Sequence, residues 1–259
     1  MLDIAIQAAR EAGQFLKESV GKVKNVEMKK GEERNLVSEI DKGSEARIIK
    51  MIKGHYPHHG ILAEESGGSA LTDEYRWIID PLDGTTNFLH GVPIFSVTIA
   101  VERKGTIIAG VTYDPNLDEL YTAEHGGGAY MNGARLKVSG ATEMINSLFV
   151  TGFPYDVEKN PDHPAEHFVN FLSVTQGVRR LGSAALDLAY VAAGRFDAFW
   201  EVALNPWDMA AGALFVNEAG GRTTDFTGAP LDIYGKRVLA SNGLVHQAAL
   251  EILAKPYHR

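Results

Sequence analysis

The chain has 259 residues, of which 45% are apolar and 22% charged, and it contains no cysteine. This composition allows a sizeable core, and the lack of cysteine excludes disulfides, thiolate metal sites and a cysteine nucleophile. The formal net charge of −8 argues against direct nucleic-acid binding, which requires a basic face. No stretch approaches the roughly 20 apolar residues of a membrane span, and the N-terminus is too charged for a signal peptide, so we expect a cytoplasmic protein without a membrane partner.

The N-terminal segment predicts two helices joined by polar residues. An amphipathic pattern extends from the start of the chain to about Val20. The lysine-rich stretch 22–34 indicates a strand with a mobile loop. A second helix is expected to begin at Asp41 and to reach His55, because apolar residues repeat along one face.

The middle of the chain predicts strands. Short apolar runs at 61–63 and 77–79 both stop abruptly at carboxylates. Three further runs follow at 95–101, 106–113 and 119–123, and turn residues separate them. Short strands joined by turns in this way predict an antiparallel meander.

Beyond about residue 151, helices and strands alternate, which suggests a second sheet between helices. The expected strands are 178–181, 196–201 and 237–240, and the expected helices are 165–174, 184–193, 209–218 and one ending near 254. The predicted fold class is mixed α/β, a layered αβαβα sandwich with two mixed or antiparallel sheets. Because no linker divides the chain, we expect one compact unit with an N-terminal α+β subdomain (1–150) and a C-terminal α/β subdomain (151–259).

The most informative segment is DPLDGTTNF, residues 80–88. Asp80 follows an apolar strand, and ligands of layered folds bind at the carboxyl ends of strands. Pro81 is expected to end that strand, and Gly84 permits a tight turn. Asp80 and Asp83 can then converge with the Leu82 carbonyl between them, an all-oxygen set of the kind that Mg²⁺ prefers.

The same turn is a candidate phosphate site. The amides of Gly84 and Thr85 would open a short helix, and helix N-termini bind phosphate. Taken alone, however, the motif is more typical of a surface turn in which Asp83 caps the next helix.

Two further acidic positions occupy comparable places. Glu64 and Glu65 end the apolar run 61–63, and Asp208 follows Trp207 at the start of an apolar helix. Each has an ordinary explanation, a solvated strand edge for the glutamates and a helix cap for Asp208. Trp207 is well placed to shield the Asp208 carboxylate.

Together, these motifs resemble the two signatures of the inositol monophosphatase family, a lithium-sensitive, magnesium-dependent group of sugar phosphatases. The resemblance covers nearly the whole chain, in the family's order and at similar spacings. It includes the Glu64-Glu65 pair, the segment 80–88, and Trp207-Asp208 followed by an alanine-rich helix and the segment 218–221. Residues 35–41 are similar to the family's N-terminal motif, and residues 179–190 resemble its bacterial branch.

The resemblance implies two or three Mg²⁺ ions. The implied metal ligands are Glu64, Asp80, the Leu82 carbonyl, Asp83 and Asp208, most of them in the N-terminal subdomain. The implied catalytic residues are Asp41, Thr85 and Glu64, of which Asp41 and Thr85 would orient and deprotonate the attacking water. The implied substrate-binding residues are Asp83, Gly84, Thr85, Arg179, Ala184, Glu201 and Asp208. Asn35 and Ser38 depart from the family's usual Asp and Thr.

The chemistry of the residues supports this assignment independently. Two carboxylates ~4 Å apart repel by about 4 kcal/mol at an effective dielectric constant of about 20, so a cluster of acids favours bound cations. Two metal ions can activate water and stabilise the leaving alkoxide. Without cysteine or a DxDx[TV] motif, direct attack by a metal-activated water is expected instead of a covalent phosphoenzyme.

The expected function is an inositol-phosphate phosphatase, a phosphomonoesterase that acts on inositol monophosphates or similar polyol phosphates. Because the Glu201 carboxylate would repel a second phosphate, monophosphates are expected to be preferred. A dual enzyme that also cleaves fructose 1,6-bisphosphate, a 3′-nucleotide phosphatase, and a regulatory protein in transcription complexes stay open as alternatives. A regulator or a structural metal-binding module would not require Asp41 and Thr85 beside a full metal set.

The remaining sequence features concern the oligomeric state, a group of histidines and a run of glycines. The resemblance implies a homodimer, for which the sequence offers only the small-residue helix 184–193. His55, His58 and His59 match no zinc signature, so a surface loop is expected. The glycines at 126–128 lack the Lys-Ser/Thr of a phosphate-binding loop and predict a hairpin turn.

Overall fold

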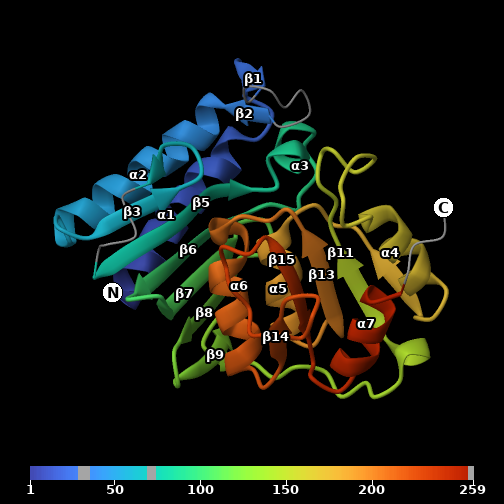
Figure 1. Cartoon of the computed structure of the whole chain (residues 1–259). Helices are drawn as coiled ribbons and strands as arrows, with labels where there is room; N and C mark the ends of the chain where they lie inside the picture. Colours follow the sequence, from blue (N-terminus) through green and yellow to red (C-terminus); the bar gives the residue numbers. More distant parts are fainter. Residues whose placement is uncertain (29–35, 69–73, 256–259) are drawn as a thin grey trace.

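A computed structural model describes residues 1–28, 36–68 and 74–255 of the chain (Figure 1). Three pairs of helices alternate with two sheets. The outer pair α1 (Leu2–Ser19) and α2 (Glu39–His55) covers an eight-stranded sheet, the middle pair is α5 (Ala184–Ala192) and α6 (Pro206–Glu218), and the pair α4 (Pro164–Leu172) and α7 (His246–Leu253) covers a five-stranded sheet. The predicted αβαβα sandwich is confirmed. Asn35, one of the departures from the family pattern, lies outside the described residues.

The eight-stranded sheet contains the predicted meander. Its strands, in spatial order, are β10 (Ala134–Arg135), β9 (Gly128–Met131), β8 (Glu119–Glu124), β7 (Thr106–Asp114), β6 (Ser96–Arg103), β5 (Tyr75–Asp83), β3 (Gly60–Ala63) and β4 (Gly67–Gly68). All neighbours are antiparallel except β3 and β5. Gly126 and Gly127 lie in the turn between β8 and β9, as expected, and Gly128 begins β9.

The five-stranded sheet is also mixed. Its order is β12 (Gly177–Arg179), β11 (Leu148–Thr151), β13 (Ala198–Val202), β15 (Arg237–Ser241) and β14 (Arg222–Thr224), and β11 is parallel to both of its neighbours. Smaller elements are the ribbon of β1 (Val26–Met28) and β2 (Leu36–Ser38), α3 (Thr85–Leu89) and the short helix η1 (Met144–Asn146). The expected subdomain boundary at residue 150 falls inside β11, and the division into subdomains stays a prediction.

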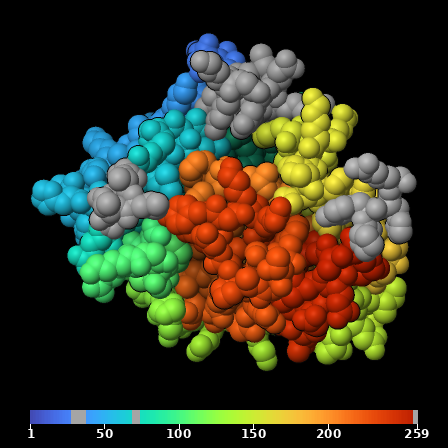
Figure 2. All heavy atoms as spheres, in the orientation of Figure 1, coloured from blue at the N-terminus to red at the C-terminus, as the bar shows by residue number. Residues whose placement is uncertain are grey.

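Alternating side chains of each sheet pack into different cores. In β5, Ile78 packs with the middle helices, whereas its neighbours Trp77 and Ile79 pack under α1 and α2. In β13, Phe199 faces the middle layer and Trp200 faces the outer pair α4 and α7. Because the central strands of the two sheets, such as β6 and β13, are buried on both faces, they are largely apolar. Figure 2 shows the C-terminal segments, orange to red, packed directly against segments of the first half of the chain.

Close approach of the middle helices depends on small residues. A Cβ at Gly110 of β7 would lie 3.0 Å from the Ala211 Cα in α6, and a Cβ at Gly212 would overlap the side chain of Leu188 in α5. Every residue of α5 except Tyr190 is buried in the chain. The small-residue helix that the sequence offered for a dimer interface therefore packs inside the subunit.

Two helices begin earlier than expected. α2 begins at Glu39 because Ser38 caps it, and Asp41 occupies the third position of a capping box. In the same way α6 begins at Pro206, with Asn205 as its cap and Asp208 at the third position. Among the helices of the described ranges, none has the length and apolar character needed to cross a membrane.

Gly110→Val should lower the free energy of unfolding by about 1–3 kcal/mol, because the added side chain must push α6 away from the sheet. Urea unfolding measures the change. Thr106→Val, on an exposed position of the same strand, is the matched control and should alter stability by less than about 0.5 kcal/mol. An equal loss of stability in both variants would contradict the packing argument.

Candidate active site

A bulge in β5 presents the first two acids. Asp80 pairs with Thr98 of β6 and Asp83 pairs with Ser96, so the register shifts between them. The expectation that Pro81 ends the strand is wrong: the bulge absorbs the residue without an N–H, and pairing resumes beyond it. The Leu82 N–H, which the bulge frees, donates to Asp80 Oδ1 at 3.0 Å. This bond orients the Asp80 carboxylate.

Glu64 lies beside Asp80 because their strands are parallel neighbours. Ala63, the last residue of β3, pairs with Ile79, and the Glu64 N–H donates to the Ile79 carbonyl oxygen at 3.2 Å. The next residue of each strand is therefore an acid at the same edge of the sheet. The prediction from the two apolar runs, that their terminal carboxylates converge, is consistent with this register.

Asp83 connects the two halves of the chain. Its Oδ2 accepts a hydrogen bond of 2.5 Å from the Ser183 hydroxyl and one of 2.9 Å from the Ala185 N–H. Ser183 is the N-cap of α5, so the carboxylate sits at the positive end of that helix dipole. Asn87 adds a second connection, because its side-chain amide donates to the carbonyl oxygens of Ile94 and Leu181 at 2.8 and 2.9 Å.

Asp208 approaches the same place from α6. Its Oδ2 accepts the Asn205 N–H at 2.7 Å, which closes the capping box at the start of the helix. The interpretation of Asp208 as an ordinary cap is thus partly right, because the residue does stabilise the helix end. Only one of its two oxygens is engaged in that bond.

These acids lie close enough together for their charges to affect one another's pKa values. Burial raises the pKa of Asp80 well above its ordinary value, and the charges of Glu64, Asp83 and Asp208 raise it further. Burial raises the pKa of Asp83 to about 6, although the Ser183 and Ala185 donors oppose the shift. Burial and the charge of Glu64 likewise raise the pKa of Asp208. Three buried acids whose ionisation is disfavoured, Asp80, Asp83 and Asp208, together with the charge of Glu64 form a site suited to cations.

The donor set fits a hard divalent ion, since it consists of carboxylate oxygens with the Leu82 carbonyl between them. In the described parts of the chain, no three or more His, Cys, Asp or Glu side chains are arranged to hold a metal ion as they stand. Their oxygens are turned towards other partners: a hydrogen bond joins the carboxyl groups of Asp80 and Glu64.

Asp41 and Thr85 are in direct contact. The Thr85 hydroxyl lies 3.0 Å from Asp41 Oδ1 and 3.1 Å from the Leu82 carbonyl oxygen. The other carboxylate oxygen of Asp41 accepts the Ser38 N–H at 2.8 Å and the Ser38 hydroxyl at 2.6 Å. Asp41 is therefore held rigidly with one oxygen directed at Thr85.

Gly84, with φ of +94°, makes the turn before Thr85, and a Cβ there would lie 2.9 Å from the Ile94 carbonyl oxygen. The helix α3 that follows has five residues, so its dipole is small. The phosphate-binding role of Gly84 and Thr85 stays a prediction.

Two of the predicted substrate-binding residues, Glu201 and Ala184, are buried. Both interact with Asp83. Burial raises the pKa of Glu201 to about 8, Arg180 lowers it and Asp83 raises it. The Glu201 carboxylate rests on Gly152, where a Cβ would overlap it. The raised pKa of Glu201 favours its protonated form at neutral pH unless nearby cations stabilise the charge.

Sequence reasoning missed one buried group beside Glu201, the carboxyl group of Asp187. Asp187 is 1% exposed, its Oδ1 lacks a hydrogen-bond partner within the described residues, and burial raises its pKa. Arg180 is the arginine whose charge acts on Asp187 and Glu201. The predicted Arg179 is exposed at the end of β12, and its guanidinium lies near Gly177 and the Val178 carbonyl. The sequence alone could not reveal which of the two adjacent arginines acts through its charge on the buried acids.

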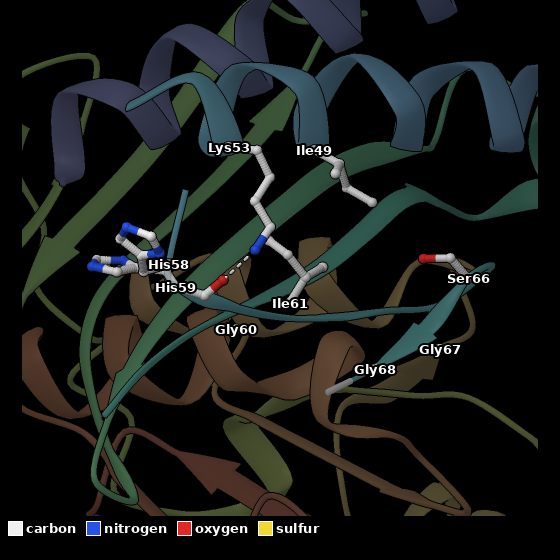
Figure 3. A pocket seen from close by; sticks show the side chains of 9 residues that line it. All are labelled: Ile49, Lys53, His58, His59, Gly60, Ile61, Ser66, Gly67 and Gly68. Carbon is white, nitrogen blue, oxygen red and sulfur yellow. Dashed lines mark hydrogen bonds between the residues drawn. The ribbon is translucent and has the colours of Figure 1, made fainter. Parts of the chain in front are cut away.

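A separate hollow of about 450 Å³ lies between α2 and β3 and contains none of the predicted site residues (Figure 3). The Lys53 ammonium group donates to the His59 carbonyl oxygen there. His58 is exposed as expected, but His59 stacks between Tyr56 and Tyr75 and accepts the Trp77 indole N–H at 3.1 Å. His59 therefore has a packing role.

Comparison with known proteins agrees with this geometry. The model of the inositol monophosphatase family matches residues 1–258. The chain belongs to the inositol monophosphatase family. Phosphatase activity is thereby supported at the level of the family, and the resemblance inferred from the motifs is confirmed.

Relatives with the same sequence identity to this chain carry two different names. The Inositol-1-monophosphatase of Mesorhizobium japonicum is 44% identical over 257 residues, which cover 99% of this chain and 97% of the relative. The Nus factor SuhB of Pseudomonas aeruginosa is also 44% identical, over 96% of this chain and 94% of its own length. Overall sequence identity therefore does not favour either of these two names for this chain.

Solved structures share the fold throughout. The extragenic suppressor protein suhB of Bartonella henselae superimposes with a TM-score of 0.91 at 41% identity, covering 98% of both chains. The inositol monophosphatase of Anabaena superimposes with a TM-score of 0.88 at 44% identity, covering 97% of this chain and 94% of that one.

The metal-free protein should lose stability between about pH 6.5 and about pH 8.5. A carboxyl whose pKa is higher in the folded than in the unfolded chain stabilises the fold fully below the unfolded value, and this contribution disappears as pH rises through the folded value. The folded value for Glu201 is about 8, so its contribution is lost in this range. Urea unfolding in EDTA measures the slope.

Glu201→Gln is the matched control and should make that slope shallower. The buried histidines His167 and His246, whose pKa burial lowers to about 4, act in the opposite sense but only below about pH 6.5, outside the range. A metal-free wild type that becomes more stable over the range would contradict the electrostatic account.

Proposed function

We propose that this protein is a Mg²⁺-dependent phosphomonoesterase that hydrolyses inositol monophosphates or similar polyol phosphates by attack of a metal-activated water. The observation that carries the proposal is the convergence of acids on Asp80, whose pKa three neighbouring carboxylates raise. Family membership and the relative named Inositol-1-monophosphatase support the reaction class.

The residues that would hold two or three Mg²⁺ ions are Glu64, Asp80, the Leu82 carbonyl, Asp83 and Asp208. When bound, the ions supply Lewis-acid stabilisation of the phosphate and lower the pKa of water. The chain itself pre-orients the ligands, since backbone N–H groups hold Asp80, Asp83 and Asp208. Such pre-organisation reduces the reorganisation needed in the transition state.

Proton removal falls to Asp41 and Thr85. Because the Thr85 hydroxyl is 3.0 Å from Asp41 Oδ1, it can pass a proton to that carboxylate while it accepts one from the attacking water. The Ser38 donors hold the other Asp41 oxygen, so the base keeps a single orientation.

We assign substrate selection to the predicted substrate-binding residues of the site. Glu201, Ala184, Asp83 and Asp208 would face the hydroxyl groups of a polyol, with Gly84 and Thr85 near the phosphate. Bound cations favour the ionised form of Glu201, which would then repel a second phosphate group. A second phosphate would be tolerated only where it points toward Arg179 and Arg180, and the charge of Arg180 already acts on Glu201.

A second candidate function is a regulatory role in transcription complexes. It is favoured by close relatives named Nus factor SuhB, in Pseudomonas aeruginosa and Escherichia coli. Retention of Asp41 and Thr85 in hydrogen-bond contact supports catalysis even if such a role exists. The dual fructose 1,6-bisphosphatase and the 3′-nucleotide phosphatase stay alternatives within the enzyme class.

We also propose that the enzyme is a cytoplasmic homodimer. The absence of cysteine is compatible with a reducing compartment, and the family resemblance supports the dimer. Because α5 is buried within the subunit, the contact must use other surfaces.

Phosphate release across a panel of inositol 1-phosphate, fructose 1,6-bisphosphate and 3′-phosphoadenosine 5′-phosphate tests the function. Activity should require Mg²⁺, vanish in excess EDTA, and show the highest kcat/KM on the inositol monophosphate. Asp83→Ala should weaken Mg²⁺ binding and abolish turnover, because it removes a proposed ligand. Asp118→Ala, an exposed acid elsewhere, is the control and should behave as wild type. Full turnover in EDTA would refute the proposal.

Asp41→Asn should lower kcat by about 10²–10⁴-fold with little change in substrate affinity, because it removes the base but keeps the side-chain shape. Steady-state kinetics at saturating Mg²⁺ measure both constants. Thr85→Ser keeps the hydroxyl and should stay within about tenfold of wild type. A nearly normal kcat in Asp41→Asn would reduce Asp41 to the capping role seen at the start of α2.

A further inference from the structure

Helix α2 contacts two segments of the proposed site, 64–65 and 80–88, through one stripe of polar side chains. The stripe consists of Asp41, Ser44 and Glu45, whose spacing of three and four residues places them on one helix face. Their exposures are 1%, 0% and 4%, so all three point into the protein. Asp41 has a proposed catalytic role, but neither the sequence nor the family motifs assigned one to Ser44 or Glu45.

Ser44 holds the bulge that carries two proposed ligands. Its hydroxyl donates to the Pro81 carbonyl oxygen at 2.8 Å, and Pro81 lies between Asp80 and Asp83. A bulge lacks regular ladder bonds, so an external donor is one of the few ways to fix its backbone. The Ser44 bond therefore sets the position of this segment relative to α2.

Glu45 holds the other ligand segment. Its Oε2 accepts the Glu65 N–H at 2.8 Å, directly after Glu64 in the chain. A carboxylate is costly to bury unless it accepts hydrogen bonds, and here the acceptor bond goes to the backbone next to a proposed ligand. α2 thereby spans the ends of β3 and β5, which supply Glu64 and Asp80.

We propose that Ser44 and Glu45 are positioning residues that set the separation of the two ligand segments and so control Mg²⁺ affinity without binding the metal. This inference rests on the proposed function, because it takes Glu64, Asp80 and Asp83 as the ligands. Groups that orient metal ligands typically change affinity or activity by about 10–100-fold when removed. Glu45 acts as a hydrogen-bond acceptor, so a neutral acceptor should replace it.

The test compares Glu45→Ala, Glu45→Gln and Ser44→Ala by calorimetric Mg²⁺ titration, by kinetics and by hydrogen exchange of the metal-free protein. In Glu45→Ala, the Mg²⁺ dissociation constant should rise about 10–100-fold and the Glu65 amide should exchange about tenfold faster. Added Mg²⁺ should restore most of kcat. Glu45→Gln should stay within about threefold of wild type in all measurements, and Ser44→Ala should weaken Mg²⁺ binding about tenfold.

Glu39→Ala is the matched control. Glu39 belongs to the same helix and also accepts backbone N–H groups, from Lys24 and Asn25 at 2.9 and 3.0 Å, but these lie away from the proposed ligands. The Mg²⁺ affinity of the Glu39→Ala variant should equal that of wild type. If Glu45→Ala does not fold, the Mg²⁺ affinities of Ser44→Ala and Glu45→Gln still test the inference.

Wild-type Mg²⁺ affinity in folded Ser44→Ala and Glu45→Ala would overturn the inference and leave the proposed function intact. A Glu45→Gln variant as impaired as Glu45→Ala would also overturn it, because the charge would then be the important property. A wild type that binds no Mg²⁺ would instead refute the proposed function. The Glu65 amide exchange of the metal-free protein still reports the bond in that case.

Discussion

Mutual repulsion among buried carboxylates is the constraint on which this structure depends. Burial disfavours ionisation of Asp80, and the charges of Glu64, Asp83 and Asp208 add to the effect. In a protein interior such an arrangement costs free energy unless protons or cations neutralise it. The surrounding fold must therefore hold the acids together against a force that would separate them.

Backbone N–H groups supply much of that restraint. Asp41, Asp80 and Asp208 each accept an amide hydrogen bond from a residue within three positions in the chain. Asp83 differs, because its donors, Ser183 and Ala185, belong to the start of α5. The site is thus complete only when the middle helices dock on the eight-stranded sheet, which makes formation of the site part of tertiary folding.

The sequence predicted most of the architecture because the relevant signals are local. Apolar periodicity marked the helices and strands, and the carboxylates that end two apolar runs marked the edge where the site lies. The parallel pairing of Ala63 with Ile79 then brings Glu64 next to Asp80. Local capping rules also explain the two helix starts that were expected too late, since Ser38 and Asn205 are favourable caps preceding the acids.

The sequence by itself determined the residue types of the site and the strands and helices that carry them, because periodicity, caps and motifs act over a few neighbouring residues. Only the tertiary structure decided that β5 continues past Pro81, that the charge of Arg180 acts on the buried acids Asp187 and Glu201, and that Ser44 and Glu45 connect α2 to both ligand segments. Each of these depends on contacts between elements far apart in the chain, and the packing of the layers, with the direction it imposes on each side chain, creates those contacts.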